Sequence, residues 1–469
     1  MQADGGSSLK THVATHGFIR NPSSQEAVDE VVVIAYKSPN SYTGEDLVEI
    51  NCHGSPYVAN ALLTLCLTQG ARLARPGEFT QRAFLNGRID LTQAEAVLDL
   101  IKSQTGRQSR QALSALAGQI GEQIRTVRYD LIELLSRVVA GIDFPEEVGD
   151  ISLDDLMDVV SASLNKLNEL ALTVRSGRFL REGVHLAIVG RPNVGKSSLL
   201  NQLLKFERAI VTDVPGTTRD SLEELLDMNG IPVVLVDTAG IRDTKDQVER
   251  IGIERTYKAI EMADVVLMVT DVSTPWSADD RSIAKMLVEK PHFVLANKID
   301  LQPDFNLCQY SAEETAAAAV VAVHGVSTAD GKADQRSASV HETLSKDSDR
   351  TGLSTGVTLQ PSGFALGVIG ISAKLGTGLD ELTRALQDWV LGDARGKDAG
   401  ASLNARQGEL CLRAVEALDL VKQTVNNDMP QDCLATDLKT AVDCLSEICG
   451  EVVSEEIITN VFATFCIGK

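Results

Sequence analysis

Residues 185–198 read HLAIVGRPNVGKSS, and this stretch decides the fold class of the domain that contains it. An apolar run typical of a buried strand ends at Gly190, a G-x-x-x-x-G-K-S loop follows, and an apolar helical run begins at Ser198. In such a loop, backbone N–H groups hold a phosphate at the helix N-terminus, Lys196 offsets the phosphate charge and Ser197 binds Mg²⁺. The stretch therefore predicts a phosphate-binding loop in an α/β domain.

Three later motifs predict which nucleotide is bound. DTAG at residues 237–240 follows an apolar strand, so we expect Asp237 in the Mg²⁺ shell and Gly240 N–H at the γ-phosphate. NKID at residues 297–300 lets the Asp300 carboxylate accept hydrogen bonds from guanine N1–H and the guanine amino group, a pair that adenine does not offer. SAK at residues 372–374 follows another strand and completes the base pocket. The nucleotide should be GTP.

The segment TDVPGTTRD at residues 212–220 lies where GTPases carry switch I, between the first helix and the next strand. Its position indicates that Thr217 or Thr218 reaches Mg²⁺ when a γ-phosphate is present, and we assign Thr218. Ile241 follows DTAG at the position where Ras-like switches carry a water-orienting glutamine. Glu249 on the following helix is the candidate for that role, and the alternative is a solvated carboxylate on a helix face.

These motifs together define the expected GTP site. Its residues are Asn193, Val194, Gly195, Lys196, Ser197, Ser198, Thr212, Asp213, Val214, Pro215, Gly216, Thr217, Thr218, Asp237, Thr238, Ala239, Gly240, Asn297, Lys298, Ile299, Asp300, Ser372, Ala373 and Lys374.

The pattern around the loop predicts how the chain is divided. Apolar strands alternate with helices over residues 183–395, which is typical of a doubly wound, mainly parallel sheet. Helical periodicity precedes this α/β P-loop GTPase domain over residues 91–182 and follows it over residues 396–469, so we expect the GTPase domain to be inserted in one all-α helical domain. Residues 1–90 predict a small α/β domain.

Three local features are also predicted. Residues 30–50 contain two β-branched runs joined by a turn, which indicates paired strands. A long helix should open with Thr92 as N-cap and Glu95 at the capping-box position, and apolar spacing continues to Val138. Residues 303–362 are rich in Ala, Ser, Thr and Gly, which predicts a flexible surface insertion.

Composition narrows the class of protein. The 469 residues are 43% hydrophobic and 23% charged, and no apolar run is long enough to span a bilayer, so we expect a cytoplasmic protein without a membrane segment. The formal net charge of -21 disfavours nonspecific adhesion to nucleic acid, although local basic clusters can still bind RNA. The eight cysteines contain no C-x-x-C pair, which indicates reduced thiols.

Along nearly its whole length the chain resembles the tRNA-modification GTPases of the MnmE (TrmE) type. Seven segments carry the resemblance in order: SYTGEDLVEINCHG, ARPGEFTQRAFLNGRIDLTQAEAVLDLI, GIDFPEE, GRPNVGKSSLLN, AIVTDVPGTTRD, DTAGIRDTKDQVERIGIER and the terminal FCIGK. The resemblance implies an N-terminal folate-binding domain that dimerises, a helical domain and an inserted G domain. It also implies that the protein forms a heterotetramer with an FAD-containing MnmG-type partner. Together they would build carboxymethylaminomethyl or aminomethyl groups on the wobble uridine of tRNAs.

The resemblance further implies cofactors and site residues. G domains would dimerise across the nucleotide and need K⁺, which Asn193, Thr212, Val214 and Thr217 would bind. Glu249 falls on the family's water-orienting glutamate. The one-carbon unit would come from 5,10-methylene-tetrahydrofolate. The folate residues carried over are Glu49, Arg88 and Lys469, with Cys466 near the one-carbon unit as a nucleophile or acid/base.

The chain departs from the family pattern at its start, where the family has a strand, a glycine-rich turn and a folate-binding arginine. We therefore expect that the sequence is truncated there, and a missing leader for a chloroplast or mitochondrion is the alternative to the cytoplasm. Two rival functions share the G-domain motifs. A prenylated signalling GTPase would use Cys466, but Gly468 and Lys469 do not fit a prenylation signal. A ribosome-assembly GTPase would normally append an RNA-binding module.

Overall fold

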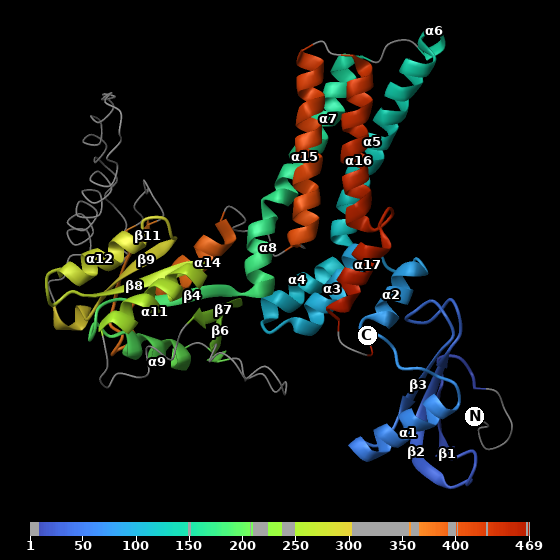
Figure 1. The fold of residues 1–469 in the computed structure, drawn as a ribbon, viewed down its shortest axis with the longest axis horizontal. Helices are drawn as coiled ribbons and strands as arrows, with labels where there is room; N and C mark the ends of the chain where they lie inside the picture. Colours follow the sequence, from blue (N-terminus) through green and yellow to red (C-terminus); the bar gives the residue numbers. More distant parts are fainter. Residues whose placement is uncertain are drawn as a thin grey trace, which may run out of the picture. The chain divides into compact units, whose positions relative to one another are not determined.

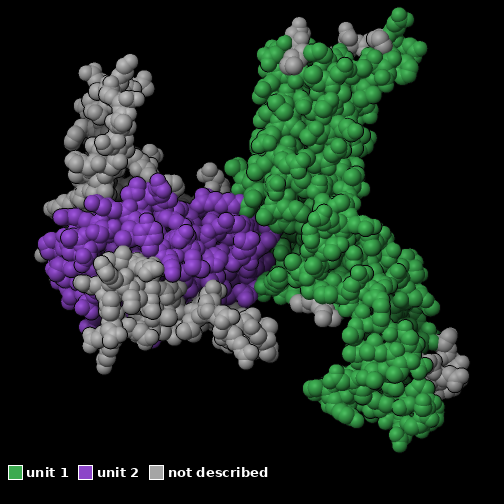
Figure 2. Space-filling view, in the orientation of Figure 1, with its two compact units in different colours: residues 1–103, 109–174, 398–469 green, residues 104–108, 175–397 purple. Residues whose placement is uncertain are grey.

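The structure is a computed structural model. It describes residues 9–148, 152–206, 208–209, 224–236, 249–302, 356–357, 365–392, 400, 402–427, 430–465 and 468. The chain divides into two units (Figure 2): residues 1–103, 109–174 and 398–469 form unit 1, and residues 104–108 and 175–397 form unit 2. Segments from both sides of unit 2 thus belong to one unit. The predicted fold class, an α/β domain inserted in a helical one, is confirmed.

The N-terminal part of unit 1 is a small α/β layer structure. Its described strands β1 (Ala14–Arg20), β2 (Ala27–Tyr36) and β3 (Leu47–Asn51) form an antiparallel sheet. Alternate residues Val31 and Val33 of β2 point to one face, where they pack with Leu62 of α1 (Pro56–Thr68). The predicted strand pair within residues 30–50 is confirmed, whereas β1 was not predicted.

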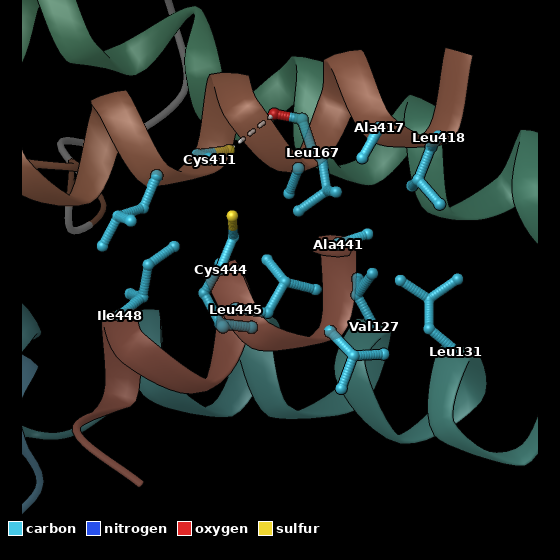
Figure 3. Packing of buried hydrophobic residues seen from close by; sticks show 14 of the residues in the cluster. Val127, Leu131, Leu167, Cys411, Ala417, Leu418, Ala441, Cys444, Leu445 and Ile448 are labelled. Atoms are coloured by element: carbon cyan, nitrogen blue, oxygen red, sulfur yellow. Dashed lines mark hydrogen bonds between the residues drawn. The ribbon is translucent and has the colours of Figure 1, made fainter. Parts of the chain in front are cut away.

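A bundle of four long helices forms the main core of unit 1 (Figure 1). The helices are α5 (Gln119–Asp143), α7 (Leu153–Ala171), α15 (Ala405–Asn426) and α16 (Gln431–Cys449). Figure 3 shows leucines, alanines and cysteines from these helices meeting in the core. Each fully buried leucine contributes roughly 1.5–3 kcal/mol, so the apolar stripes of the two chain segments hold each other in place.

The prediction of one long helix opened by Thr92 is wrong. The structure has three helices instead: α3 (Leu91–Lys102), α4 (Gly106–Leu116) and α5. Gly118 lies between α4 and α5 and has a left-handed φ of 88°. The N-cap of α3 is Asp90, whose carboxylate accepts from Gln93 N while Gln93 Oε1 accepts from Asp90 N. Glu95 pairs with Arg406 of α15, because its side chain faces the bundle rather than the helix start.

Shorter helices complete unit 1. They are α2 (Glu78–Leu85), α6 (Pro145–Val148), α17 (Glu455–Ala463) and α8 (Thr173–Glu182), the last of which continues into unit 2. Phe462 and Phe465 pack with Leu91 and Ala94 in a separate small core. Gly77 has a φ of 66°, and a Cβ there would lie 2.8 Å from the backbone oxygen of Phe462. The turn before α2 therefore needs glycine so that α17 can approach.

Unit 2 is built on one mixed sheet (Figure 1). Among the described residues its strand order is β10-β11-β9-β8-β4-β7-β6-β5, with β11, β9, β8, β4 and β7 parallel and the outer strands antiparallel. The strands are β4 (Val184–Val189), β5 (Arg208–Ala209), β6 (Glu224–Met228), β7 (Ile231–Val236), β8 (Val265–Asp271), β9 (His292–Asn297), β10 (Gly356–Val357) and β11 (Ala365–Ile371). The five parallel strands were predicted and the three antiparallel ones were not.

Helices cover both faces of this sheet, as a doubly wound fold requires. One face packs against α9 (Lys196–Phe206) and α14 (Leu379–Leu391), and the other against α11 (Glu249–Met262) and α12 (Ala278–Met286). Residues of β4 alternate between the two cores, with Leu186 on the first face and Ala187 on the second.

The predicted insertion at residues 303–362 lies outside the described residues except for β10. Within the described parts of the chain, no helix is both long enough and apolar enough to traverse a lipid bilayer.

Candidate nucleotide-binding site

The phosphate-binding loop follows β4 and leads directly into α9. A Cβ at Gly190 would collide with the backbone oxygen of Val269, and a Cβ at Gly195 would collide with the side-chain nitrogen of Asn297. Asn193 between them has a left-handed φ of 63°. The two glycines of the motif are thus needed because neighbouring strand ends approach the loop backbone. The first N–H groups of α9 have no partner within the helix, which suits an anion there.

Lys196 is held over this loop. Its Nζ donates to the backbone oxygens of Gly190 at 2.7 Å and Arg191 at 2.9 Å, and burial lowers the pKa of this amine. A phosphate beside it would favour the charged ammonium, because an opposite charge offsets the desolvation that burial imposes. Ser197 and Ser198 follow in the first turn of α9.

Arg191 anchors the same loop to the neighbouring helix. Its Nε lies 3.3 Å from Oδ2 of Asp280, which is 1% exposed in the first turn of α12, and its Nη2 donates to the hydroxyl of Thr274. The loop is therefore fixed by a side chain as well as by the strand ends.

Asn297 ends β9 and joins two motifs that are distant in sequence. Its Nδ2 donates to the backbone oxygen of Val194 at 2.6 Å, and its Oδ1 accepts from Ala373 N at 2.9 Å. The side chain is 2% exposed, so neither bond competes with bulk water. The P-loop, NKID and SAK segments consequently meet at one edge of the sheet.

Two further polar contacts involve residues of the NKID and SAK motifs. Ser372 Oγ donates to Oδ1 of Asp300 at 2.7 Å, which leaves the second carboxylate oxygen for a ligand. Lys298, at a left-handed φ of 70°, forms an ion pair with Asp271 at the end of β8. Burial acts to raise the pKa of the Asp271 carboxyl, but hydrogen bonds from Lys298 and Ser273 outweigh it and the pKa is lowered.

A second group of predicted residues lies in the N-terminal part of unit 1. Glu49 on β3 is exposed and accepts from the Tyr36 hydroxyl at 3.0 Å, a bond that raises the pKa of Tyr36. Arg88 lies after α2 with its guanidinium carbon 5.5 Å from the ring centroid of Tyr42. No ion pair between Glu49 and Arg88 is present in this described region.

Comparison with protein families and with characterised proteins shows the family of the chain. Residues 91–466 match the model of the MnmE helical domain, and residues 2–88 match that of the GTP-binding protein TrmE N-terminus. The tRNA modification GTPase MnmE of Aquifex aeolicus is 41% identical over 98% of this chain and 91% of its own length. The chain belongs to the MnmE family of tRNA modification GTPases. The MnmE of Acetivibrio thermocellus is 38% identical over 98% of this chain and 90% of its length. That of a Cyanothece species is 37% identical over 100% and 91%.

Several residues of the predicted site meet in the described part of the structure. Val194, Asn297 and Ala373 form one hydrogen-bonded group, and Asp300 with Ser372 forms another. Ile299 lies in the 3₁₀ turn Ile299–Leu301 and Lys374 in the turn after β11. Glu249 begins α11, but its side chain lies outside the described part. Also outside the described residues are Thr212, Asp213, Val214, Pro215, Gly216, Thr217, Thr218, Asp237, Thr238, Ala239, Gly240, Cys466 and Lys469.

Two acidic residues that pair with basic side chains of the site were not predicted from the sequence. Asp271 holds Lys298, and Asp280 holds Arg191. The signal for Asp271 was its place at the end of the apolar strand VVLMVTD, since polar residues at the carboxyl ends of parallel strands often face the site. Asp280 forms the capping box of α12 with Ser277, and no sequence motif connects it with residue 191.

Proposed function

We propose that this chain binds and hydrolyses GTP as part of the modification of the wobble uridine of tRNAs. The main support for GTP binding is the hydrogen bond between Asn297 and Val194, which joins the base-binding motif to the phosphate loop. Asp300 would accept from guanine N1–H and the amino group, while Ser372 holds one of its oxygens. Family membership supports the tRNA part.

Charge at the phosphates would be offset by Lys196 and two cations. Ser197 and Thr218 would hold Mg²⁺, and K⁺ would be bound by Asn193, Thr212, Val214 and Thr217. Asn193 already has the left-handed backbone that turns the loop at that point. Bound cations stabilise charge that develops on the transferred phosphoryl group. Glu249 at the start of α11 would orient the attacking water, since the Ile241 side chain has no hydrogen-bonding group.

The modification itself would need further groups. With an FAD-containing MnmG-type partner, in a heterotetramer built on a homodimer of this chain, the complex would add a carboxymethylaminomethyl or aminomethyl group to C5 of the uridine. A methylene-tetrahydrofolate would supply one carbon. Glu49, Arg88 and Lys469 would bind this folate, and the Cys466 thiolate would act beside the one-carbon unit. Residues 1–90 form the folate domain in this proposal, residues 91–182 and 396–469 the helical domain, and residues 183–395 the G domain.

Mass spectrometry of tRNA nucleosides tests this function. Cells that lack the protein should lose the aminomethyl-type groups at the wobble uridine, and the wild-type gene should restore them. A gene carrying Asp300→Asn should not restore them. Unchanged wobble uridines together with altered ribosomal RNA binding would favour the ribosome-assembly alternative instead.

A further inference from the structure

The backbone of Arg88 is fixed by the end of α2. Helix α2 stops at Leu85, Gly87 takes a left-handed φ of 69°, and two reverse bonds close the turn. Gly87 N donates to Phe84 O and Arg88 N donates to Ala83 O, both at 2.9 Å. This is the Schellman arrangement, in which glycine avoids the steric cost of the left-handed position. The backbone position from which the Arg88 side chain extends is therefore fixed.

The guanidinium of Arg88 lies over the ring of Tyr42, in the loop between β2 and β3. The distance from Cζ to the ring centroid is 5.5 Å, within the range of a cation–π contact. Tyr42 is 36% exposed and Arg88 is itself exposed, so the ring contact leaves the guanidinium accessible to solvent. Neither a salt bridge nor a side-chain hydrogen bond of Arg88 occurs among the described residues. Its donor fork is thus available to a ligand.

The loop that carries Tyr42 is tied to the same helix. The hydroxyl groups of Tyr42 and Thr80 are 2.9 Å apart, and Thr80 is fully buried on α2. Asn86 Nδ2 donates to Thr43 O at 2.7 Å, and Arg82 pairs with Glu45 at 2.9 Å. The Tyr42 ring and the Arg88 backbone are consequently both held against α2, so the ring has a defined position relative to the point where the Arg88 side chain begins.

We propose that Tyr42 is a positioning residue that holds the Arg88 guanidinium for a carboxylate of a bound folate. The ring face restricts the rotamers of Arg88, and a preorganised fork loses less entropy when it pairs with a carboxylate. Folates carry such carboxylates on their glutamyl part, whereas the pterin end is neutral. This inference rests on the folate site assigned above.

A double-mutant cycle tests the proposal. The probe is 5-formyltetrahydrofolate, an oxidation-resistant reduced folate, titrated into the full-length chain by calorimetry. Tyr42→Leu should weaken binding about twofold to fivefold, as expected for an exposed cation–π contact. In the Arg88→Met background the same change should have no further effect, because the guanidinium that it positions is gone. Tyr42→Phe keeps the ring and should retain most of the affinity.

Controls separate the possible failures. Tyr57→Leu removes a tyrosine that is 81% exposed on α1 and should leave binding unchanged. Tyr42→Met replaces the leucine variant if thermal melting shows that the latter does not fold. If Tyr42→Leu weakens folate binding equally with and without Arg88, the role of Tyr42 is merely structural and the inference is overturned. Wild-type affinity in both Tyr42→Leu and Tyr42→Met would also overturn it. Absence of binding by the wild-type chain would instead overturn the proposed folate site.

Discussion

Asn297 Nδ2 donates to the backbone oxygen of Val194 over 2.6 Å, although the two residues are 103 positions apart in the chain. The same side chain accepts from Ala373 N at 2.9 Å. One buried amide therefore determines the distance between the phosphate loop and the base-binding segments. A change in this amide should affect affinity for every part of the nucleotide rather than for the base alone.

Asn297→Ala should weaken GDP binding by at least about tenfold and lower the melting temperature. The change leaves Val194 O and Ala373 N buried without their partner, and each such group costs about 1–3 kcal/mol. Titration with a fluorescent GDP analogue and a thermal melt measure the two effects. Asn201→Ala, on the exposed side of α9, is the matched control and should change neither. Wild-type affinity in the Asn297 variant would show that the loops keep their places without this bond.

Asp300→Asn should change base specificity from guanine to xanthine. The carboxylate would accept two N–H groups of guanine, whereas an amide places a donor against one of them and suits the carbonyl of xanthine. The hydrogen bond from Ser372 Oγ can be kept by the amide oxygen, so the loop should retain its conformation. We expect GTP binding to fall roughly 100-fold, since each hydrogen bond to a charged group contributes about 1.5–3 kcal/mol. Hydrolysis assays with GTP and XTP in parallel measure the change, and equal loss of both activities would contradict it.

The sequence was sufficient for the parallel sheet but not for every contact that shapes the site. Strands such as β4 and β8 are apolar on both faces, which is the pattern of a buried parallel strand. The short antiparallel strands β5 and β10 carry two residues each and leave no periodic signal. The division of the long helical stretch was missed because Gly118 and a Ser103–Thr105 turn, rather than proline, end the helices.

At the site, too, local features could be predicted from the sequence, whereas contacts between distant residues could not. Motif spacing correctly predicted that the P-loop follows a strand and leads into a helix, because both elements are defined by local sequence. The partners of Lys298 and Arg191 could not be predicted, since they depend on which strand ends and helices lie next to each other in space. Asp90, rather than the predicted Thr92, is the N-cap of α3. The Asp90 carboxylate accepts hydrogen bonds from both Gln93 N and the Thr92 hydroxyl.

Asn193→Ala should remove the preference for K⁺ over Na⁺ in GTP hydrolysis. In the wild-type chain we expect hydrolysis to be at least about tenfold faster in K⁺, which corresponds to about 1.4 kcal/mol of transition-state stabilisation. The variant should have similar rates in both salts. Its affinity for GDP, measured in the same salts, serves as the control for an intact site. A K⁺ preference that persists in the variant would exclude Asn193 as a cation ligand.

Glu249→Ala should lose turnover while GTP binding is retained. A group that orients or deprotonates the attacking water contributes about 100-fold or more to the rate, whereas it does not hold the ground-state nucleotide. Single-turnover hydrolysis at saturating GTP measures the rate. Glu261→Ala, which changes an exposed carboxylate farther along α11, is the control and should hydrolyse GTP normally. Turnover that survives in the Glu249 variant would assign the water to another residue.

The buried thiols of the helical bundle should make unit 1 sensitive to alkaline pH. Burial raises the pKa of Cys411 to about 11 and that of Cys449 to about 12, above the ordinary range that unfolding restores. Above about pH 9 the unfolded chain loses these protons while the folded chain keeps them, so stability falls as pH rises, by about 1.4 kcal/mol per unit and thiol. Cys411→Ala should be less stable at neutral pH but lose less stability between pH 9 and 11. Urea unfolding at several pH values, followed by circular dichroism, measures both slopes, and identical slopes would show that folding does not raise the pKa of Cys411.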